Sequence, residues 1–304
     1  MRLRVCYATR YLYPSPVTDS HNEVRLMPVN DEEQTCLNFQ IATRPTVPIF
    51  NYALPSGRVH HFNLRARHQE LSLTAEAVVL THRRTLFTDN DTLDLDSAFY
   101  ARPDVADRYA EYLAPTPRVP LLPEVDFLTQ QAHDEAEGQS PGDFLRSLTN
   151  AIHTDFRYLP GSTTVDTPLP DMVAARAGVC QDFTHLMLSV CRRKGIPARY
   201  VSGYLFTSER PEIEEPQRLA QDFSGRRERS GLSGGDATHA WVECLLPNDR
   251  WYGFDPTNNI LANDSYIKVH HGRDYDDVTP LRGIYKGAGD AMLEVSVRVT
   301  QETE

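Results

Sequence analysis

The chain has 304 residues, 40% of them hydrophobic, which is enough for one large globular domain or two ordinary ones. Its formal net charge of −11 argues against nucleic acid or an anionic membrane as a partner, because either would require a basic face. No stretch approaches the roughly 20 apolar residues of a transmembrane helix, and the start, MRLRVCYATRYLYP, lacks the apolar segment of a secretory signal.

The first segment, residues 1–85, contains only strand and turn patterns. Turn signals at Pro14-Ser15-Pro16, Asn30-Asp31 and Pro55-Ser56-Gly57 separate the β-type runs 2–13, 23–27, 35–42, 59–66 and 70–80. Short strands with regular turns predict an N-terminal antiparallel β-sandwich domain. The adjacent residues His60 and His61 point to opposite faces of a strand, so they are interpreted as structural histidines.

The segment 86–140 is expected to be a helical linker region. Within it, Asp89, Asp91 and Asp94 invite a calcium interpretation, but the run departs from the EF-hand pattern at Leu93 and lacks the glycine in the middle of the loop. A solvated turn that caps a helix is the better interpretation. The sequence predicts no metal site and no cofactor.

The third segment, residues 141–304, is expected to be the catalytic domain. Pro141 begins a helix with an apolar face, and a second helix follows Cys180, with Phe183, Leu186, Met187 and Val190 at helical spacing. Gly195 ends this helix, and a strand follows it.

Cys180 therefore lies in the first turn of a buried helix. The free N–H groups there favour a thiolate, which is the nucleophilic form of cysteine. The alternative is a small buried residue without chemistry, as most free cysteines are. The five cysteines, which show no CxxC pair and no paired framework, favour a reducing cytoplasmic location and are Cys6, Cys36, Cys180, Cys191 and Cys244.

Residues 207–236 form a long polar segment, acidic at its beginning and basic later. Loops of this length inside a domain are usually lids, binding loops or disordered insertions. The hypothesis is a lid over Cys180, and a mobile solvated loop is an equal alternative.

Residues 238–246 and 250–255 are predicted to form an antiparallel hairpin around the turn signal Pro247-Asn248-Asp249. If the loop has an odd number of residues, Asp255 falls opposite Trp241 and one diagonal step from His239, on the same face. A cysteine at a helix start, a histidine at a strand end and an aspartate at the hairpin's return match the roles of nucleophile, proton shuttle and orienter. After the hairpin, residues 266–270 and 292–300 are expected to complete the core sheet.

The motifs GVCQDF, KGIPARYVSGYL, THAWVE and GFDPTNN resemble those of bacterial transglutaminase-like proteins, which share the papain-like fold. The N-terminal segment also resembles the β-rich domain that precedes the core in that family. The resemblance implies an α+β fold in which the helix carrying the cysteine packs on an antiparallel sheet. It also implies that Cys180 is the nucleophile, His239 the base and Asp255 its partner.

The mechanism implied is attack of the Cys180 thiolate on a carboxamide or peptide carbonyl, with transfer of a proton by His239 to the departing amine. The N–H of Cys180 can stabilise the oxyanion. Both tryptophans lie in the hairpin, so an upstream Trp donor of the animal transglutaminase kind is absent. We expect hydrolysis of a peptide or protein amide through a thioester. The alternatives are transfer of a glutamine acyl group to an amine, and an inactive binding module. The sequence makes no prediction of oligomeric state.

Overall fold

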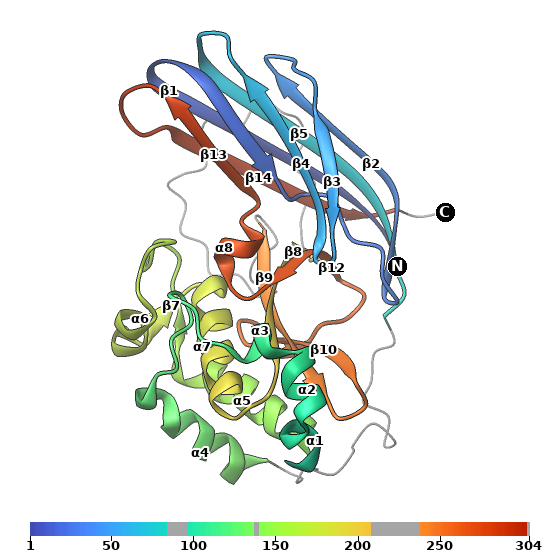
Figure 1. Ribbon diagram of the computed structural model, residues 1–304, viewed down its shortest axis with the longest axis vertical. Coiled ribbons are helices and arrows are strands. Elements are labelled where there is room, and N and C mark those ends of the chain that lie inside the picture. Colours follow the sequence, from blue (N-terminus) through green and yellow to red (C-terminus); the bar gives the residue numbers. More distant parts are fainter. Residues whose placement is uncertain (84–96, 137–139, 208–237, 303–304) are drawn as a thin grey trace.

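The computed structural model describes residues 1–83, 97–136, 140–207 and 238–302 and has an α+β fold (Figure 1). A seven-stranded antiparallel sheet forms one end of the molecule, and a five-stranded sheet with helices packed on it forms the other. The fold class predicted from the sequence is confirmed. The strands of the larger sheet are β1 (Arg2–Val24), β2 (Gln34–Arg44), β3 (Phe50–Leu54), β4 (Gly57–Leu64), β5 (His68–Thr81), β13 (Leu281–Lys286) and β14 (Met292–Gln301).

Strand β1 organises the larger sheet because its two halves have different partners. Residues 2–12 pair with β5 and β14, and residues 18–24 pair with β4 and β13. Pro14 and Pro16, expected from sequence to end a strand, lie inside β1 instead. They are tolerated because they fall where the register shifts between the two sets of partners, so neither proline removes a ladder hydrogen bond.

The last two strands return to the first sheet. The expectation that residues 292–300 complete the core sheet is wrong, since β14 pairs with β1 along its whole length, from Leu12 opposite Met292 to Leu3 opposite Gln301. The strand instead lies along the side of β1 that β5 leaves open, because residues 2–12 of β1 pair with β5 on one side and with β14 on the other. The boundaries at residues 85 and 140 stay a prediction.

The core sheet has the order β11-β10-β9-β8-β12. Its members are β8 (Ala198–Leu205), β9 (His239–Leu246), β10 (Arg250–Asp255), β11 (Ile260–Leu261) and β12 (Tyr266–Gly272). As predicted, residues 266–270 belong to this sheet, where β12 pairs with β8. A short parallel pair, β6 (Arg157–Tyr158) and β7 (Ala177–Gly178), lies beside it.

Helix α7 (Cys180–Arg193) packs on the core sheet through its predicted apolar face. Phe183, Leu186, Met187 and Val190 are at most 1% exposed and share one hydrophobic cluster with Ala240, Val242 and Cys244 of β9 and with helix α5 (Pro141–Asp155). Ser140 precedes helix α5, and its hydroxyl caps the helix by accepting the N–H of Asp143. Burial of these faces fixes the start of α7 against the sheet.

The remaining helices pack against α5, α7 and the strands of the core sheet. They are α1 (Ser97–Ala101), α2 (Pro103–Arg108), α3 (Ala110–Leu113), the 3₁₀ turn η1 (Pro123–Val125), α4 (Asp126–Glu135), α6 (Leu169–Ala175) and α8 (Tyr275–Val278). None of the helices in the described parts of the chain is long and apolar enough to cross a membrane. The aspartates of the calcium interpretation and the lid segment, apart from its first residue, lie outside the described residues.

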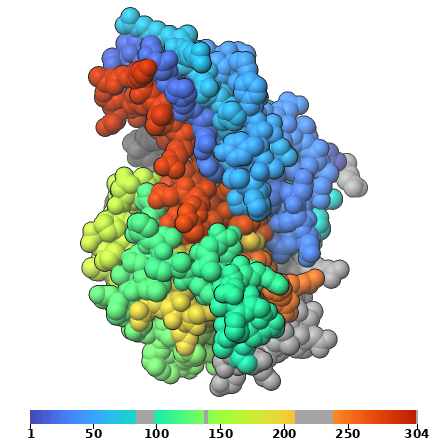
Figure 2. Space-filling model, in the orientation of Figure 1, coloured from blue at the N-terminus to red at the C-terminus, as the bar shows by residue number. Residues whose placement is uncertain are grey.

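The two sheets meet at β12 and β8. Tyr204, Ile267 and Val269 of the core belong to the hydrophobic cluster of the N-terminal sheet, and Tyr204 donates a hydrogen bond to the carbonyl of Leu26 at 3.0 Å. In the space-filling view the C-terminal residues, in red, lie between the blue N-terminal strands and the green helices (Figure 2). The N-terminal domain is thus packed directly on the sheet that carries His239.

Candidate active site

Cys180 is the first residue of α7, as the sequence predicts. The preceding residue, Val179, is extended, and its N–H donates to Asp182 Oδ2 at 2.8 Å. Thr163 donates to the same oxygen at 2.6 Å. Gly178 permits this arrangement, because a Cβ there would lie 2.8 Å from both Cβ and Oδ2 of Asp182. Asp182 therefore fixes the turn that presents a half-buried Cys180 at a positive helix end.

His239 and Asp255 come together through the predicted hairpin. Residues 247–249 connect β9 to β10, so the loop is odd, and the register places Phe254 opposite Val242 and the next residue, Asp255, beside Trp241. The parity argument is confirmed. His239 Nε2 donates to Asp255 Oδ2 at 2.7 Å, and both side chains are fully buried.

Asp255 is held by four further hydrogen bonds. Its Oδ1 accepts the backbone N–H groups of Thr257 and Asn258, at 2.8 and 3.3 Å. Its Oδ2 accepts the side-chain amide of Asn258 and the hydroxyl of Tyr266, both at 2.6 Å. Burial alone would raise the pKa of Asp255, but His239 and these donors hold it below its usual value. The carboxylate is therefore ionised and fixed in orientation.

The imidazole of His239 has one nitrogen left for Cys180. Its Nδ1 is buried and makes no hydrogen bond of ordinary geometry within the described residues. Burial alone would lower the pKa of His239, but Asp255 and, more weakly, Cys180 raise it to about 10. Because Nε2 is engaged by Asp255, Nδ1 is the nitrogen available to the thiol. A protonated imidazole beside a cysteine favours the thiolate.

Tyr200 on β8 also faces this region. Its ring lies 5.2 Å from the ring of His185 and 6.3 Å from that of Tyr275. The side chain of Tyr200 is 2% exposed. Burial raises the pKa of Tyr200 well above its usual value, and Cys180 is the next contributor. The hydroxyl is therefore a neutral donor near the sulfur.

Three other histidines near the core sheet are held elsewhere. His185 is buried, which lowers its pKa to about 3, and it accepts the N–H of Tyr275. His270, whose pKa burial lowers to about 4, bonds Ser56, and His271 contacts Arg199. Within the described residues, no group of three or more His, Cys, Asp or Glu side chains is arranged to hold a metal ion.

Tyr266, Asn258 and Tyr200 were not selected from the sequence. Asn258 had a recognisable signal, because an Asn three residues after a strand-ending Asp in DPTNN is suited to a turn that bonds back to the carboxylate. Tyr266 and Tyr200 look like ordinary strand residues. Their proximity to the site depends on pairing between strands far apart in sequence, for which one chain gives no signal.

Two family models match the chain. The Transglutaminase-like superfamily covers residues 128–256, and the Bacterial transglutaminase-like N-terminal region covers residues 3–80. An uncharacterized protein of Mycobacterium leprae is 35% identical over 305 residues, which is 99% of this chain and 99% of the relative.

Two further comparisons concern smaller regions or the fold alone. A protein-glutamine gamma-glutamyltransferase of Pseudomonas aeruginosa is 30% identical over 110 residues, covering 36% of this chain and 14% of that protein. The crystal structure of a candidate cysteine protease from Cytophaga hutchinsonii matches with a TM-score of 0.73 at 21% identity, covering 100% of this chain and 92% of that one. The latter likeness establishes a shared fold.

Proposed function

The chain belongs to the bacterial transglutaminase-like family, and on that premise we propose that it is an acyl-transfer enzyme with a Cys180-His239-Asp255 triad. The observation that carries the proposal is the buried pair of His239 and Asp255, whose Nε2 and Oδ2 atoms lie 2.7 Å apart. The second nitrogen of His239 is free within the described part of the chain, and Cys180, at the start of a helix, contributes to the raised pKa of this histidine. A buried, fully bonded carboxylate and a histidine with one unpartnered nitrogen are costly for stability alone.

The reaction we propose begins with the thiolate–imidazolium pair. Cys180 Sγ attacks a carbonyl carbon, and the oxyanion that forms is stabilised by the backbone N–H of Cys180. His239 then gives the proton on Nδ1 to the leaving amine, which leaves a thioester. Asp255 keeps its bond to Nε2–H throughout and stabilises the charged imidazole.

Tyr200 is the candidate for the second oxyanion donor. Its side chain is buried, and burial together with Cys180 raises its pKa, so the hydroxyl stays protonated and can donate a hydrogen bond. An oxygen that develops negative charge next to Cys180 would accept this hydrogen bond most strongly in the transition state, which is the condition for catalysis. The sequence offered no second donor, so this role is assigned from burial and position.

For the second half of the reaction we propose attack by water on the thioester, so that a peptide or protein amide is hydrolysed. The competing outcome is transfer to an amine, which the similarity to a glutamyltransferase over 110 residues favours. A glutamine peptide incubated with the enzyme and a primary amine separates the two by mass spectrometry. Conversion to glutamate supports hydrolysis, and an amine adduct supports transfer. The unpaired state of all five cysteines supports the cytoplasmic location that we propose.

The triad itself is tested with Cys180→Ala and a thiol-reactive amide analogue. We expect the wild type to be labelled at Cys180 and to digest members of a peptide library, and the variant to keep its melting temperature and lose turnover. Folded wild-type protein that is neither labelled nor active would instead identify a binding module on this scaffold.

A further inference from the structure

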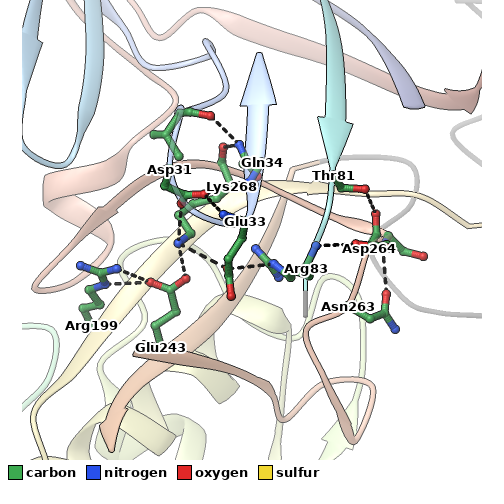
Figure 3. Close-up of polar contacts among 12 residues, drawn as sticks. Asp31, Glu33, Gln34, Thr81, Arg83, Arg199, Glu243, Asn263, Asp264 and Lys268 are labelled. Atoms are coloured by element: carbon green, nitrogen blue, oxygen red, sulfur yellow. Dashed lines mark hydrogen bonds and ion pairs between the residues drawn. The ribbon is translucent and has the colours of Figure 1, made fainter. Parts of the chain in front are cut away.

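A network of buried charges joins the N-terminal domain to the strand that carries His239. Glu243 on β9 is 2% exposed and forms ion pairs with Arg199 at 2.6 Å and Lys268 at 2.5 Å. Lys268 also reaches Asp31, in the connection between β1 and β2, at 3.0 Å (Figure 3). The N-terminal domain therefore contacts the face of the core sheet opposite α7.

A second set of contacts holds the turn before β12, at residues 263–266. Thr81 at the end of β5 donates its hydroxyl to the carbonyl of Asp264 at 2.8 Å, and the N–H of Arg83 donates to Asp264 Oδ1 at 2.8 Å (Figure 3). The turn is closed by a bond from the N–H of Tyr266 to the carbonyl of Asn263 at 3.0 Å. The end of β5 thus fixes the chain two residues before Tyr266.

Tyr266 connects this turn to the His–Asp pair. Its hydroxyl donates to Asp255 Oδ2 at 2.6 Å, and its ring lies 6.0 Å from the ring of His239. Trp241 stacks on His239 at 6.2 Å and 25° and meets Tyr266 edge to face at 5.2 Å. The guanidinium of Arg83 lies 5.9 Å from the Trp241 ring. Two routes therefore lead from β5 to the two members of the pair.

We propose that the N-terminal β domain positions the His239–Asp255 pair, with Arg83 and Asp264 as the positioning residues. Asp264 acts through the turn and Tyr266, and Arg83 acts through Trp241. The inference rests on the proposed function, because positioning has meaning only if the pair is catalytic. The carboxylate of Asp255 accepts several donors, so a shift of Tyr266 changes the direction in which Oδ2 meets the imidazole.

The test uses the full chain with Asp264→Ala and a matched control, Asp31→Ala. Both substitutions remove a carboxylate at the same interface, but the carboxylate of Asp31 bonds Glu33, Gln34 and Lys268 rather than the turn of residues 263–266. We expect Asp264→Ala to lower kcat about 10- to 100-fold with little change in KM, which is the size of effect that a misplaced catalytic group produces. Asp264→Asn, which keeps an oxygen for the N–H of Arg83, should restore most of the loss.

The second measurement is the rate at which iodoacetamide alkylates Cys180 at pH 6 and at pH 9. A substitution that only destabilises the fold would not change the ratio of these two rates. Asp264→Ala should slow alkylation at pH 6, where the imidazolium is needed, and leave it unchanged at pH 9. Arg83→Met keeps the backbone N–H and the apolar stem but loses both the contact with Trp241 and the ion pair with Glu33 at 3.0 Å. It should show the same pattern with a smaller loss, about threefold to tenfold.

The positioning role would be overturned if Asp264→Ala and Asp31→Ala lost kcat equally and in proportion to the fraction of unfolded protein. In that case both variants would also keep the wild-type ratio of alkylation rates at pH 6 and pH 9. A wild-type protein without turnover and without enhanced alkylation would instead overturn the proposed function. An active wild type with fully active Asp264→Ala would leave that function standing and remove only the positioning role.

Discussion

Asp255→Asn is the sharpest test of the site because the structure dictates where the new amide must point. Oδ1 of Asp255 faces the backbone N–H groups of Thr257 and Asn258, which cannot turn into acceptors. An NH₂ group is therefore excluded from that position. At the position of Oδ2 it meets three groups: the hydroxyl of Tyr266, which can rotate and accept, the side-chain amide of Asn258, which can accept if it flips, and Nε2 of His239, which can accept only if it gives up its proton.

The imidazole proton of the variant is therefore forced onto Nδ1, the nitrogen that must take the thiol proton. The substitution also removes the charge that, against the effect of burial, raises the pKa of His239 to about 10. The same change in a Ser-His-Asp triad costs about 10⁴ in kcat for the same tautomeric reason. We expect kcat/KM to fall by about 10³ to 10⁴, equivalent to about 4 to 5.5 kcal/mol of transition-state stabilisation.

The first assay is alkylation of Cys180 by iodoacetamide, which requires no knowledge of the substrate. Wild-type protein should react at pH 6, where an ordinary thiol is almost wholly protonated. Asp255→Asn should lose this reaction and recover it at pH 9. Tyr266→Phe is the matched control, since it removes one hydrogen bond to the carboxylate and leaves the carboxylate itself, so its loss should stay within about 100-fold. Folded Asp255→Asn protein that reacts at pH 6 and turns over like the wild type would refute the reasoning.

Three further substitutions test other parts of the structure. Tyr200→Phe should lower kcat about 10²- to 10³-fold, the cost of one oxyanion donor. Alkylation by iodoacetamide forms no oxyanion, so its rate should stay unchanged. Tyr275→Phe is the control, and a larger loss of kcat in this variant would assign the donor role to Tyr275. Glu243→Gln should lower the free energy of unfolding by about 3 kcal/mol at pH 7, the low end for breaking a buried ion pair, because Lys268 keeps Asp31. The partners of Glu243 hold its pKa below the usual value despite burial. Its contribution to the free energy of unfolding is therefore present above about pH 4.3 and declines as pH falls through the lowered pKa of the folded state. Denaturant unfolding curves in which the variant differs from the wild type equally at pH 3 and pH 7 would contradict this. Gly203→Ala should destabilise the core, since a Cβ would clash with the carbonyl of Ile267 and lie 2.5 Å from the Trp241 ring, and an unchanged melting temperature would contradict that packing.

The residues of the site could be selected from sequence because each lies beside a local signal. The periodicity after Cys180 predicts a helix, and Pro247-Asn248-Asp249 predicts a hairpin whose parity brings Asp255 to His239. These relations span few residues and depend on backbone geometry that every helix and hairpin shares. The proximity of His239 and Asp255 could therefore be predicted by counting residues along the hairpin.

What could not be predicted depends on partners distant in the chain. Pro14 reads as a strand end, and only the change of partners along β1 explains why it is not one. The alternation of residues 292–300 identifies a strand but not which of two sheets it joins. The strand pairs with β1, which lies nearly 300 residues away in the chain. Arg83 has no sequence pattern that links it to Trp241, because their contact forms only when the two sheets pack.

The pairing of β1 with β14 has a consequence for how the protein can be divided. The N–H of Glu302 donates to the carbonyl of Arg2 at 2.9 Å, so the two ends of the chain lie side by side. A fragment that stops before residue 281 would leave β1 with a bare edge along both halves, which is a template for aggregation. Conversely, a short peptide joining residue 302 to residue 1 would allow new ends to be opened in a surface loop, giving a circular permutant that keeps both sheets intact.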